Sequence, residues 1–206
     1  DNIIIDGITF VNPEDTTRSG VIRMENVKNI TVRNCRADFP WMAGPFILCR
    51  GGVNINIENN ISRGGDYPIT VIGKNIKIRH NTIVDATMWS TSFWGIANLE
   101  ITDNIFYRPC IQNKRNTALL LNDIKGKVVS DGNVFWSPVK EHPVGGTIRD
   151  GNAKVLKASK TLNEWQQLTG LDKNSIHADP MFADYEKGDF RLKAESPARG
   201  KGADIK

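Results

Sequence analysis

A seven-residue pattern recurs along most of this chain at intervals of 21 to 29 residues. One clear copy reads Asn-Ile-Lys-Ile-Arg-His-Asn, from Asn75 to Asn81. A repeat of this length indicates that one small unit of structure stacks on copies of itself, so that each unit contacts mainly its neighbours. The copies begin at Asn2, Asn29, Asn54, Asn75, Asn98 and, in degraded form, Lys127.

Apolar and polar residues alternate within each copy. In the copy at Asn75, Ile76 and Ile78 flank Lys77, and a period of two predicts a strand with one buried face. A second apolar run accompanies each copy, such as residues 69–72, and no helical period is present. Strands that return in one direction without a crossover helix predict a coil, with each turn about 4.8 Å above the last. The alternative is an antiparallel β-sandwich, which does not need near-identical strands at one phase.

Two columns of polar residues support the coil. Six residues after the leading position, four copies carry asparagine, and stacked buried amides hydrogen-bond from one turn to the next. Four residues after the leading position, the charge alternates in sign, so neighbours in a parallel stack can pair with little stabilisation per exposed pair. The asparagines are Asn60, Asn81, Asn104 and Asn133, and the charged residues are Asp6, Arg33, Glu58 and Arg79.

With these repeats the chain resembles the bacterial right-handed parallel β-helix proteins, the pectate-lyase-like solenoids. The resemblance extends to residues 161–170, 179–182, 189–192 and 196–200, which look like the closing segment of such proteins. It implies an all-β fold, a right-handed parallel β-helix solenoid of about six rungs with a short C-terminal helix and a capping tail. The family includes polysaccharide lyases, some glycoside hydrolases and many secreted proteins. The repeat therefore indicates a fold but does not specify a reaction.

The chain divides into two parts by its pattern. Residues 1–150 hold the rungs, and residues 151–206 hold a helix and a capping segment. Thr161 and Glu164 form a capping-box pattern that begins the helix, and Gly170 suits its end. The apolar face of this helix is Leu162, Trp165 and Leu168. We expect the helix to pack on the last rungs and the remainder to cover the open C-terminal end, because open edge strands need cover.

The first rung is apolar, and the chain starts inside it at Asp1. A β-helix that began there would expose an unpaired rung. We therefore expect this chain to be the C-terminal part of a longer protein, whose upstream part packs on the first rung and carries the targeting signal. Together with the resemblance, this predicts a secreted, periplasmic or cell-surface location in a bacterium.

Charge and cysteine content narrow the choice of partners. The chain has 27 Lys and Arg against 23 Asp and Glu, a net charge of +4. This mild excess suits an anionic polysaccharide and lacks the clustered run of a nucleic-acid binder. No apolar run reaches the length of about 18 residues that indicates a membrane span. Cys35, Cys49 and Cys110 are too few for a disulfide framework and are expected to be buried free thiols.

Loops of variable length at one phase project from one edge of a solenoid, where such proteins usually bind. Aromatic side chains there suit the apolar faces of sugar rings, and charged ones suit an acidic sugar. Each also has a plainer interpretation, as a plug over the core or a solvated loop residue. The predicted substrate-binding residues are Trp41, Tyr67, Trp89, Trp94, Tyr107, Arg108 and Trp136. The predicted catalytic residues are Arg50, Arg63, Asp38, Asp66 and Asp85.

Two reactions fit these loops. The resemblance implies that a lyase removes a proton beside a uronate carboxylate with an Arg or Lys base, and neutralises that carboxylate with a cation. Arg50, Arg63 and Arg108 could supply such groups. A hydrolase instead needs two carboxylates about 5 to 9.5 Å apart. Asp38, Asp66 and Asp85 could supply that pair.

The function predicted here is action on an extracellular, acidic polysaccharide, most simply by β-elimination. Hydrolysis on the same scaffold and a non-catalytic binding or structural solenoid are the two alternatives. The chain has no zinc-ligand spacing and no EF-hand loop, so calcium between Asp residues of adjacent rungs is the one metal left open. His80 ends a strand and is interpreted as a corner residue.

Overall fold

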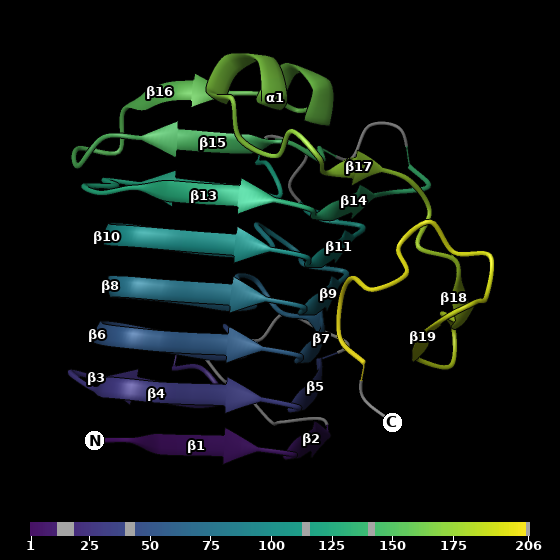
Figure 1. The fold of residues 1–206 in the computed structure, drawn as a ribbon, viewed down its shortest axis with the longest axis horizontal. Coiled ribbons are helices and arrows are strands. Elements are labelled where there is room, and N and C mark those ends of the chain that lie inside the picture. The colour runs from purple at the N-terminus through teal and green to yellow at the C-terminus, as the bar shows by residue number, and fades with distance from the viewer. Residues whose placement is uncertain (12–18, 40–43, 113–115, 140–142, 205–206) are drawn as a thin grey trace.

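The computed structural model describes residues 1–11, 19–39, 44–112, 116–139 and 143–204. It is a right-handed parallel β-helix of about five turns, one fewer than the number of copies predicts. The turns rise from the N-terminus at one end of the coil to a short helix at the other (Figure 1). The fold class predicted from the repeats is therefore confirmed.

Two sheets, A and B, form the wall of the coil, and adjacent parallel strands in each come from successive turns. Sheet A contains β1 (Ile3–Asp6), β3 (Ile22–Glu25), β4 (Lys28–Arg33), β6 (Ile47–Glu58), β8 (Ile69–Arg79), β10 (Thr91–Thr102), β12 (Leu119–Asn122), β13 (Val128–Asp131), β15 (Gly146–Arg149) and the antiparallel β16 (Val155–Ala158). Sheet B contains β2 (Thr9–Val11), β5 (Arg36–Phe39), β7 (Ile61–Gly64), β9 (Thr82–Val84), β11 (Ile105–Tyr107), β14 (Val134–Trp136) and β17 (Ile176–His177). A separate antiparallel hairpin joins β18 (Phe182–Asp184) to β19 (Asp189–Leu192).

The long strands β6, β8 and β10 each pair along two stretches with an irregularity between them. We call the stretch before the irregularity the first half of sheet A; it comprises residues 22–25, 47–50, 69–72, 91–94, 119–122 and 146–149. The stretch after the irregularity, which pairs with β4 and β13, is the second half. At the irregularity, a Cβ atom on Gly73 would lie 2.2 Å from the carbonyl oxygen of Gly52. Only glycine allows the backbones of successive turns to approach this closely.

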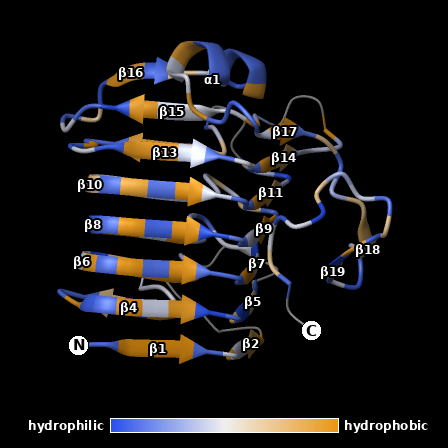
Figure 2. Ribbon diagram, in the orientation of Figure 1, coloured by the Kyte–Doolittle hydropathy of each residue, from blue (hydrophilic) through white to orange (hydrophobic). Residues whose placement is uncertain are grey.

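The core is a column of apolar side chains inside the coil. Alternate residues of the first half of sheet A enter one buried cluster, and the residues between them point outward. Figure 2 shows the same alternation as bands of apolar and polar residues across β6, β8 and β10. One inward column, running up successive turns, is Met24, Cys49, Val71, Phe93 and Leu121.

The first rung remains open. Strand β1 lies at one end of sheet A and β2 at one end of sheet B, so each lacks a neighbour on one side among the described residues. Ile3, Ile4 and Val11 are 52%, 60% and 71% exposed, and Figure 2 shows β1 as mostly apolar. The first rung therefore exposes apolar side chains among the described residues.

The leading asparagine of each copy lies at a corner of the coil. Asn54 and Asn75 have φ angles of 57° and 56°, a left-handed conformation that asparagine tolerates better than most residues. The Asn75 side-chain amide donates to that of Asn54 at 2.9 Å, as part of an exposed ladder from Asn2 to Asn98. His80 has a φ of 51° at the next corner, which agrees with its interpretation as a corner residue.

The buried asparagine column forms the predicted ladder. The Nδ2 atom of Asn60 donates to Oδ1 of Asn81 at 3.0 Å. The same bond, at the same distance, joins Asn81 to Asn104 and Asn104 to Asn133. Each of these Oδ1 atoms also accepts a backbone N–H from the turn below, as Asn104 does from Asn81 at 2.9 Å. The ladder therefore satisfies polar groups that the interior of the coil hides from water.

A buried carboxylate ends this ladder. Asp172, with no exposed surface, accepts from the Asn133 amide at 2.9 Å and from the Trp165 indole N–H at 2.9 Å. It also accepts from the hydroxyls of Ser130 at 2.8 Å and Ser175 at 2.7 Å. Four donors thus converge on one carboxylate where the stack of amides stops.

The outward charge column pairs as its alternating signs predict. The Arg33 guanidinium lies 2.9 Å from the Asp6 carboxylate, and that of Arg79 lies 2.8 Å from Glu58. The Arg33 and Asn34 side chains lower the pKa of Asp6, with the Asn34 hydrogen bond as the larger cause. These pairs are partly exposed, so each contributes little to stability.

The predicted helix is present as α1 (Leu162–Thr169). The Thr161 hydroxyl accepts from the backbone N–H of Glu164 and donates to its carboxylate, and Gly170 ends the helix with a φ of 71°. Trp165 is fully buried against Gly146 on the last rung. The helix covers the C-terminal end as expected, but Leu168 on its predicted apolar face is 46% exposed.

The remainder of the C-terminal part does not cover that end. Residues 178–204, which we call the tail, turn back along the outer face of sheet B towards the first rungs (Figure 1). Its last segment, residues 201–204, crosses three successive turns and bonds each of them. The Asp204 N–H donates to Asn59 at 2.6 Å, the Ala203 N–H to Thr82 at 2.9 Å, and the Gly202 N–H to the carbonyl of Asp103 at 2.7 Å.

All three cysteines are buried free thiols, as predicted. Burial raises the pKa of the Cys49 thiol to about 11, from 9.0 in its ordinary range. Below about pH 9, the unfolded and folded states both keep this proton, so the group does not affect stability. As the pH rises from about 9 to about 11, the unfolded state loses a proton that the folded state keeps, and the free energy of unfolding falls.

We therefore expect Cys49→Ala to change how stability depends on alkaline pH. Its free energy of unfolding should fall less between about pH 8 and pH 11 than that of the unmodified protein, because one buried thiol no longer titrates. Urea unfolding at both pH values measures this difference. Equal falls in the two proteins would contradict the buried-thiol explanation.

Candidate functional site

The structure divides the predicted site residues between two faces, which corrects the expectation of a single edge. Arg50, Tyr67, Trp89 and Trp94 lie on or beside the first half of sheet A. Asp38, Arg63, Asp85, Tyr107, Arg108 and Trp136 lie on sheet B or at the ends of its strands. Trp41 lies outside the described residues.

On sheet B, two arginines and one carboxylate from successive turns come together. The Asp85 carboxylate lies 3.6 Å from Nε of Arg63 and 3.3 Å from Nε of Arg108. The Tyr185 hydroxyl from the tail donates to Asp85 at 2.7 Å and accepts from Arg108. Both guanidinium groups lie over the Tyr185 ring, 5.3 and 5.4 Å from its centroid.

This cluster fastens the tail to sheet B. Burial, followed by the bond to Asp85, raises the pKa of the Tyr185 hydroxyl far above its usual range, so the hydroxyl stays protonated as a donor. Tyr107 packs against the rings of Tyr185 and Phe182 at 5.1 Å, and is thereby covered by the tail. The catalytic roles of Arg63 and Asp85 remain predictions, whereas their contacts have a clear structural purpose.

Other predicted residues have local partners. Asp66 accepts from the Thr87 hydroxyl at 2.6 Å, and its carbonyl accepts from the N–H of Trp89 at 3.1 Å, as expected of a turn former. Asp38 lies 3.9 Å from the Arg36 guanidinium. The ring of Trp136 packs on that of His177 with centroids 5.1 Å apart, beneath β17.

The outward face of the first half of sheet A presents a continuous row of side chains. Its members occupy the last position of each strand segment and are directly paired in register from one turn to the next. We call this row the Trp94 strip. From the first turn upward it consists of Glu25, Arg50, Ile72, Trp94, Asn122 and Arg149.

The middle of the Trp94 strip exposes apolar and aromatic surface. Ile72 is 37% exposed and Trp94 is 36% exposed, although both belong to long central strands. The indole N–H of Trp94 donates to the Ser92 hydroxyl at 2.6 Å, which fixes the orientation of the ring. An aromatic ring held in one orientation beside a flat sheet is suited to stack on another flat, partly apolar ring.

An unneutralised cation lies two turns below Trp94 on the strip. Arg50 is exposed, and no carboxylate in the described part of the chain pairs with it. The nearest acidic member of the strip, Glu25, is already paired with Arg23 at 2.5 Å. Arg50 is therefore free to bind an anionic group of a ligand.

The upper end of the strip holds polar atoms without partners. Oδ1 of Asn122 and Nε of Arg149 are buried, and neither has a hydrogen-bond partner within the described residues. The Arg149 guanidinium lies over the Trp89 ring at 5.6 Å, and Trp89 stacks on Tyr67 with centroids 5.4 Å apart. Trp89 is only 8% exposed, so it supports Arg149 and does not itself present a face to a ligand.

Four members of the strip were not predicted from the sequence: Glu25, Ile72, Asn122 and Arg149. Ile72 and Asn122 end the second apolar run of their repeats, as Arg50 and Trp94 end theirs. An alignment of these second runs would have identified both. Arg149 and the tail residue Tyr185 lie beyond the last clear copy, where the repeat gives no signal.

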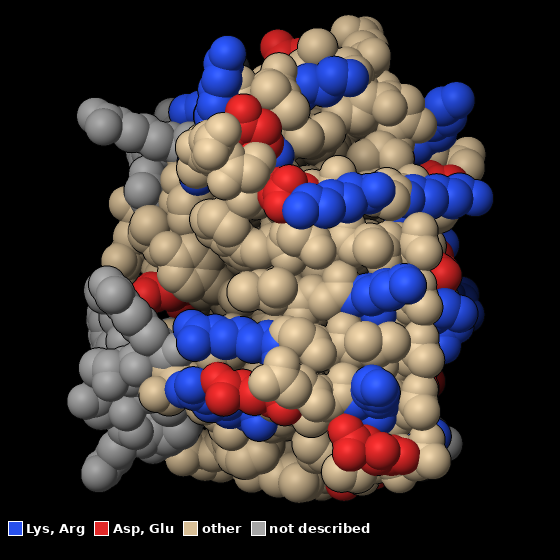
Figure 3. Space-filling model, turned by 90° about the vertical axis from the view of Figure 1, so that its left-hand side faces the viewer, with Lys and Arg blue, Asp and Glu red and all other residues tan. Residues whose placement is uncertain are grey.

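The charged residues on the adjacent corner do not form a site. Figure 3 shows Lys and Arg there in rows separated by uncharged side chains, with Asp and Glu among them. In the described ranges, no three His, Cys, Asp or Glu side chains are grouped so that they could hold a metal ion. The described helix is also too short to cross a membrane.

By its architecture the chain is a parallel β-helix protein. It is similar to the uncharacterized protein YwoF of Bacillus subtilis, with 25% identity over 187 residues that cover 74% of this chain. The chain spans about 40% of the length of that relative. No family model matches the chain, and no solved structure matches it.

Proposed function

We propose that this protein binds an extracellular, acidic polysaccharide along the Trp94 strip. The observation that carries the proposal is the exposed indole of Trp94 in register with the unneutralised Arg50. The indole suits the apolar face of a sugar ring, and Arg50 suits a uronate carboxylate. Above them, the half-buried Arg149 supplies a second guanidinium that suits a carboxylate group.

Within this proposal, β-elimination fits the strip better than hydrolysis. Elimination needs a base that removes the proton beside the uronate carboxylate and a cation that neutralises that carboxylate, and Arg50 and Arg149 are two candidates for these roles. Hydrolysis needs two carboxylates on either side of the bond, whereas Glu25 is the only acidic residue of the strip and is paired with Arg23. We propose Arg50 as the cation of a lyase reaction and a location outside the cytoplasm, where such polymers occur.

Replacing Trp94 with alanine tests the binding surface. We expect Trp94→Ala to raise the Kd for polygalacturonate oligosaccharides by about tenfold or more, a loss of about 1.4 kcal/mol. Isothermal titration calorimetry measures this change. The matched control is Val129→Ala, which removes an exposed apolar side chain from the second half of sheet A. Equal affinities in all three proteins would refute binding at the strip.

Arg50→Gln, with Lys77→Gln as its control, separates recognition of charge from stacking. It should weaken binding of the acid form of the oligosaccharide and leave the methyl-esterified form unaffected.

With calcium or chelator present, ultraviolet absorbance from an unsaturated product would support elimination, and new reducing ends without that absorbance would indicate hydrolysis. Binding without either signal would leave a glycan-binding protein and contradict the lyase assignment.

A further inference from the structure

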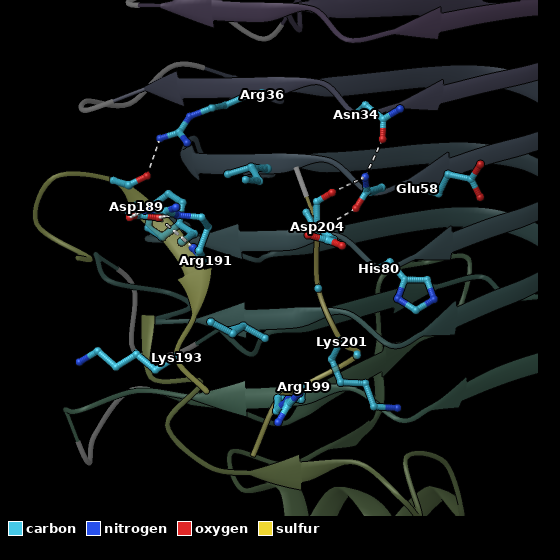
Figure 4. A pocket seen from close by; sticks show the side chains of 18 of the residues that line it. Asn34, Arg36, Glu58, His80, Asp189, Arg191, Lys193, Arg199, Lys201 and Asp204 are labelled. Atoms are coloured by element: carbon cyan, nitrogen blue, oxygen red, sulfur yellow. Dashed lines mark hydrogen bonds and ion pairs between the residues drawn. The ribbon is translucent and has the colours of Figure 1, made fainter. Parts of the chain in front are cut away.

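A groove of about 1340 Å³ lies on the other side of the coil, between the tail and the corner where the second half of sheet A meets sheet B. One wall is the tail from Lys187 to Asp204, and the other includes Arg36, Asn59 and His80 on successive turns. Figure 4 shows these walls facing each other across the groove. None of the predicted site residues that the structure describes lines this groove, which is therefore separate from the Trp94 strip.

The lining of this groove is strongly basic. Among the described residues, seven Lys or Arg side chains line it, against three Asp or Glu side chains. This excess equals the net charge of +4 carried by the whole chain. The groove is therefore a concave surface with more positive than negative side chains, although partners outside the lining neutralise several of the cations.

Most of these cations are paired with a carboxylate, and two are not. Arg33, Lys187 and Arg191 pair with carboxylates at 2.6 to 3.0 Å, and Lys201 pairs with Asp103. The Arg191 guanidinium holds the pKa of Asp189 at about 2, so this pair stays ionised and mutually neutralised. The unneutralised pair is Lys193 and Arg199, which are exposed and have no carboxylate partner among the described residues.

The rest of the lining indicates which kind of anion fits. Its one Phe, Tyr or Trp residue among the described residues, Phe190, is 3% exposed, and the exposed ring of the lining is the imidazole of His80. The groove therefore lacks the row of aromatic rings on which successive nucleic-acid bases stack. The Asp204 carboxylate also lies in the groove, with no cation paired to it in the described part. It would repel a continuous row of phosphates but can accept hydrogen bonds from sugar hydroxyls.

We propose that this groove is a second binding site, which takes a carboxylate-bearing polysaccharide segment through Lys193 and Arg199. Binding here depends mainly on charge, because the groove exposes no Phe, Tyr or Trp ring among the described residues. Binding at the Trp94 strip depends on stacking as well as on the charge of Arg50. Added salt screens exposed charges but changes stacking little, so binding at the groove should be the more sensitive to salt.

The test uses Lys193→Gln/Arg199→Gln in the full chain, with Lys74→Gln/Lys77→Gln as the control that removes the same charge from the exposed face of sheet A. Polygalacturonate is the probe, and isothermal titration at several salt concentrations is the measurement. We expect the groove variant to lose a salt-sensitive binding phase with about a tenfold or greater rise in its Kd. The control should keep both phases.

Combination with Trp94→Ala separates this inference from the proposed function. If the groove binds and the strip does not, Trp94→Ala leaves the salt-sensitive phase intact and the groove variant removes it. An unchanged titration in the groove variant would overturn the inference. Tighter binding of duplex DNA than of polygalacturonate, lost in the same variant, would overturn it as well, because it would assign the groove to nucleic acid. Far-ultraviolet circular dichroism checks that the variants keep their fold.

Discussion

Asp172→Ala is expected to lower the free energy of unfolding by about 4 kcal/mol. The carboxylate has no exposed surface and accepts hydrogen bonds from Asn133, Trp165, Ser130 and Ser175. Without it, four buried donors lose a partner, and each unsatisfied buried group costs about 1–3 kcal/mol before the structure relaxes. Alanine also tolerates the φ of 56° at this position less well than aspartate or asparagine does. Urea unfolding followed by circular dichroism measures the loss.

Two further variants show whether the loss comes from the hydrogen bonds. Asp172→Asn keeps the shape but turns one acceptor into a donor that faces other donors, so we expect an intermediate loss of about 2 kcal/mol. Asp184→Ala removes a partly exposed carboxylate paired with Lys187 and should change stability by less than about 1 kcal/mol. Similar losses for Asp172→Ala and Asp184→Ala would show that the four converging donors contribute little.

Asn104→Ala is expected to cost about 3 kcal/mol of folding free energy. Asn104 has no exposed surface. Its amide donates to Asn133 and to two backbone carbonyls, and its Oδ1 accepts from the side chain and the backbone N–H of Asn81. Removal therefore leaves partners on the turns above and below without hydrogen bonds. Thermal and urea unfolding both report the change.

The exposed ladder supplies the matched control. Asn98→Gly removes an amide that bonds Asn75 at 3.0 Å, but that amide is exposed, so water replaces the lost bond. Glycine also suits the φ of 66° at this position, which alanine would not. We expect a loss below about 1 kcal/mol. A loss as large as that of Asn104→Ala would contradict the view that burial gives the inner ladder its effect.

The repeat determines much of the fold because it acts through neighbours. The register that pairs Ile55 with Ile76, and Ile76 with Leu99, follows from aligning the copies. The same alignment places Asn60 and Asn81 at one level of successive turns. Once the phase of the copies is known, the pairing of strands in a parallel coil follows from it. The fold class, the buried asparagines and the alternating charges were therefore all predictable.

The positions of the tail and of the site residues do not follow from the repeat. Tyr185 bonds Asp85, 100 residues earlier in the chain, and no periodic pattern connects two such residues. The sequence places the loops at one phase of the coil, but it does not determine which face of the coil their side chains lie on. Arg63 and Arg50 are close in sequence, yet one meets the tail on sheet B and the other stands exposed on sheet A. These placements depend on non-repeating contacts that only the three-dimensional structure reveals.

The crossing segment at residues 201–204 changes how the coil is expected to come apart. In a stack whose turns touch only adjacent turns, unfolding can start at an open end and proceed one turn at a time. Here Asn59, Thr82 and Asp103 on three turns are bonded to one short stretch of chain. The three turns all lose a hydrogen bond when that stretch detaches, so the unfolding of one turn is coupled to the unfolding of the others. A protein built from repeats can in this way unfold in one cooperative step.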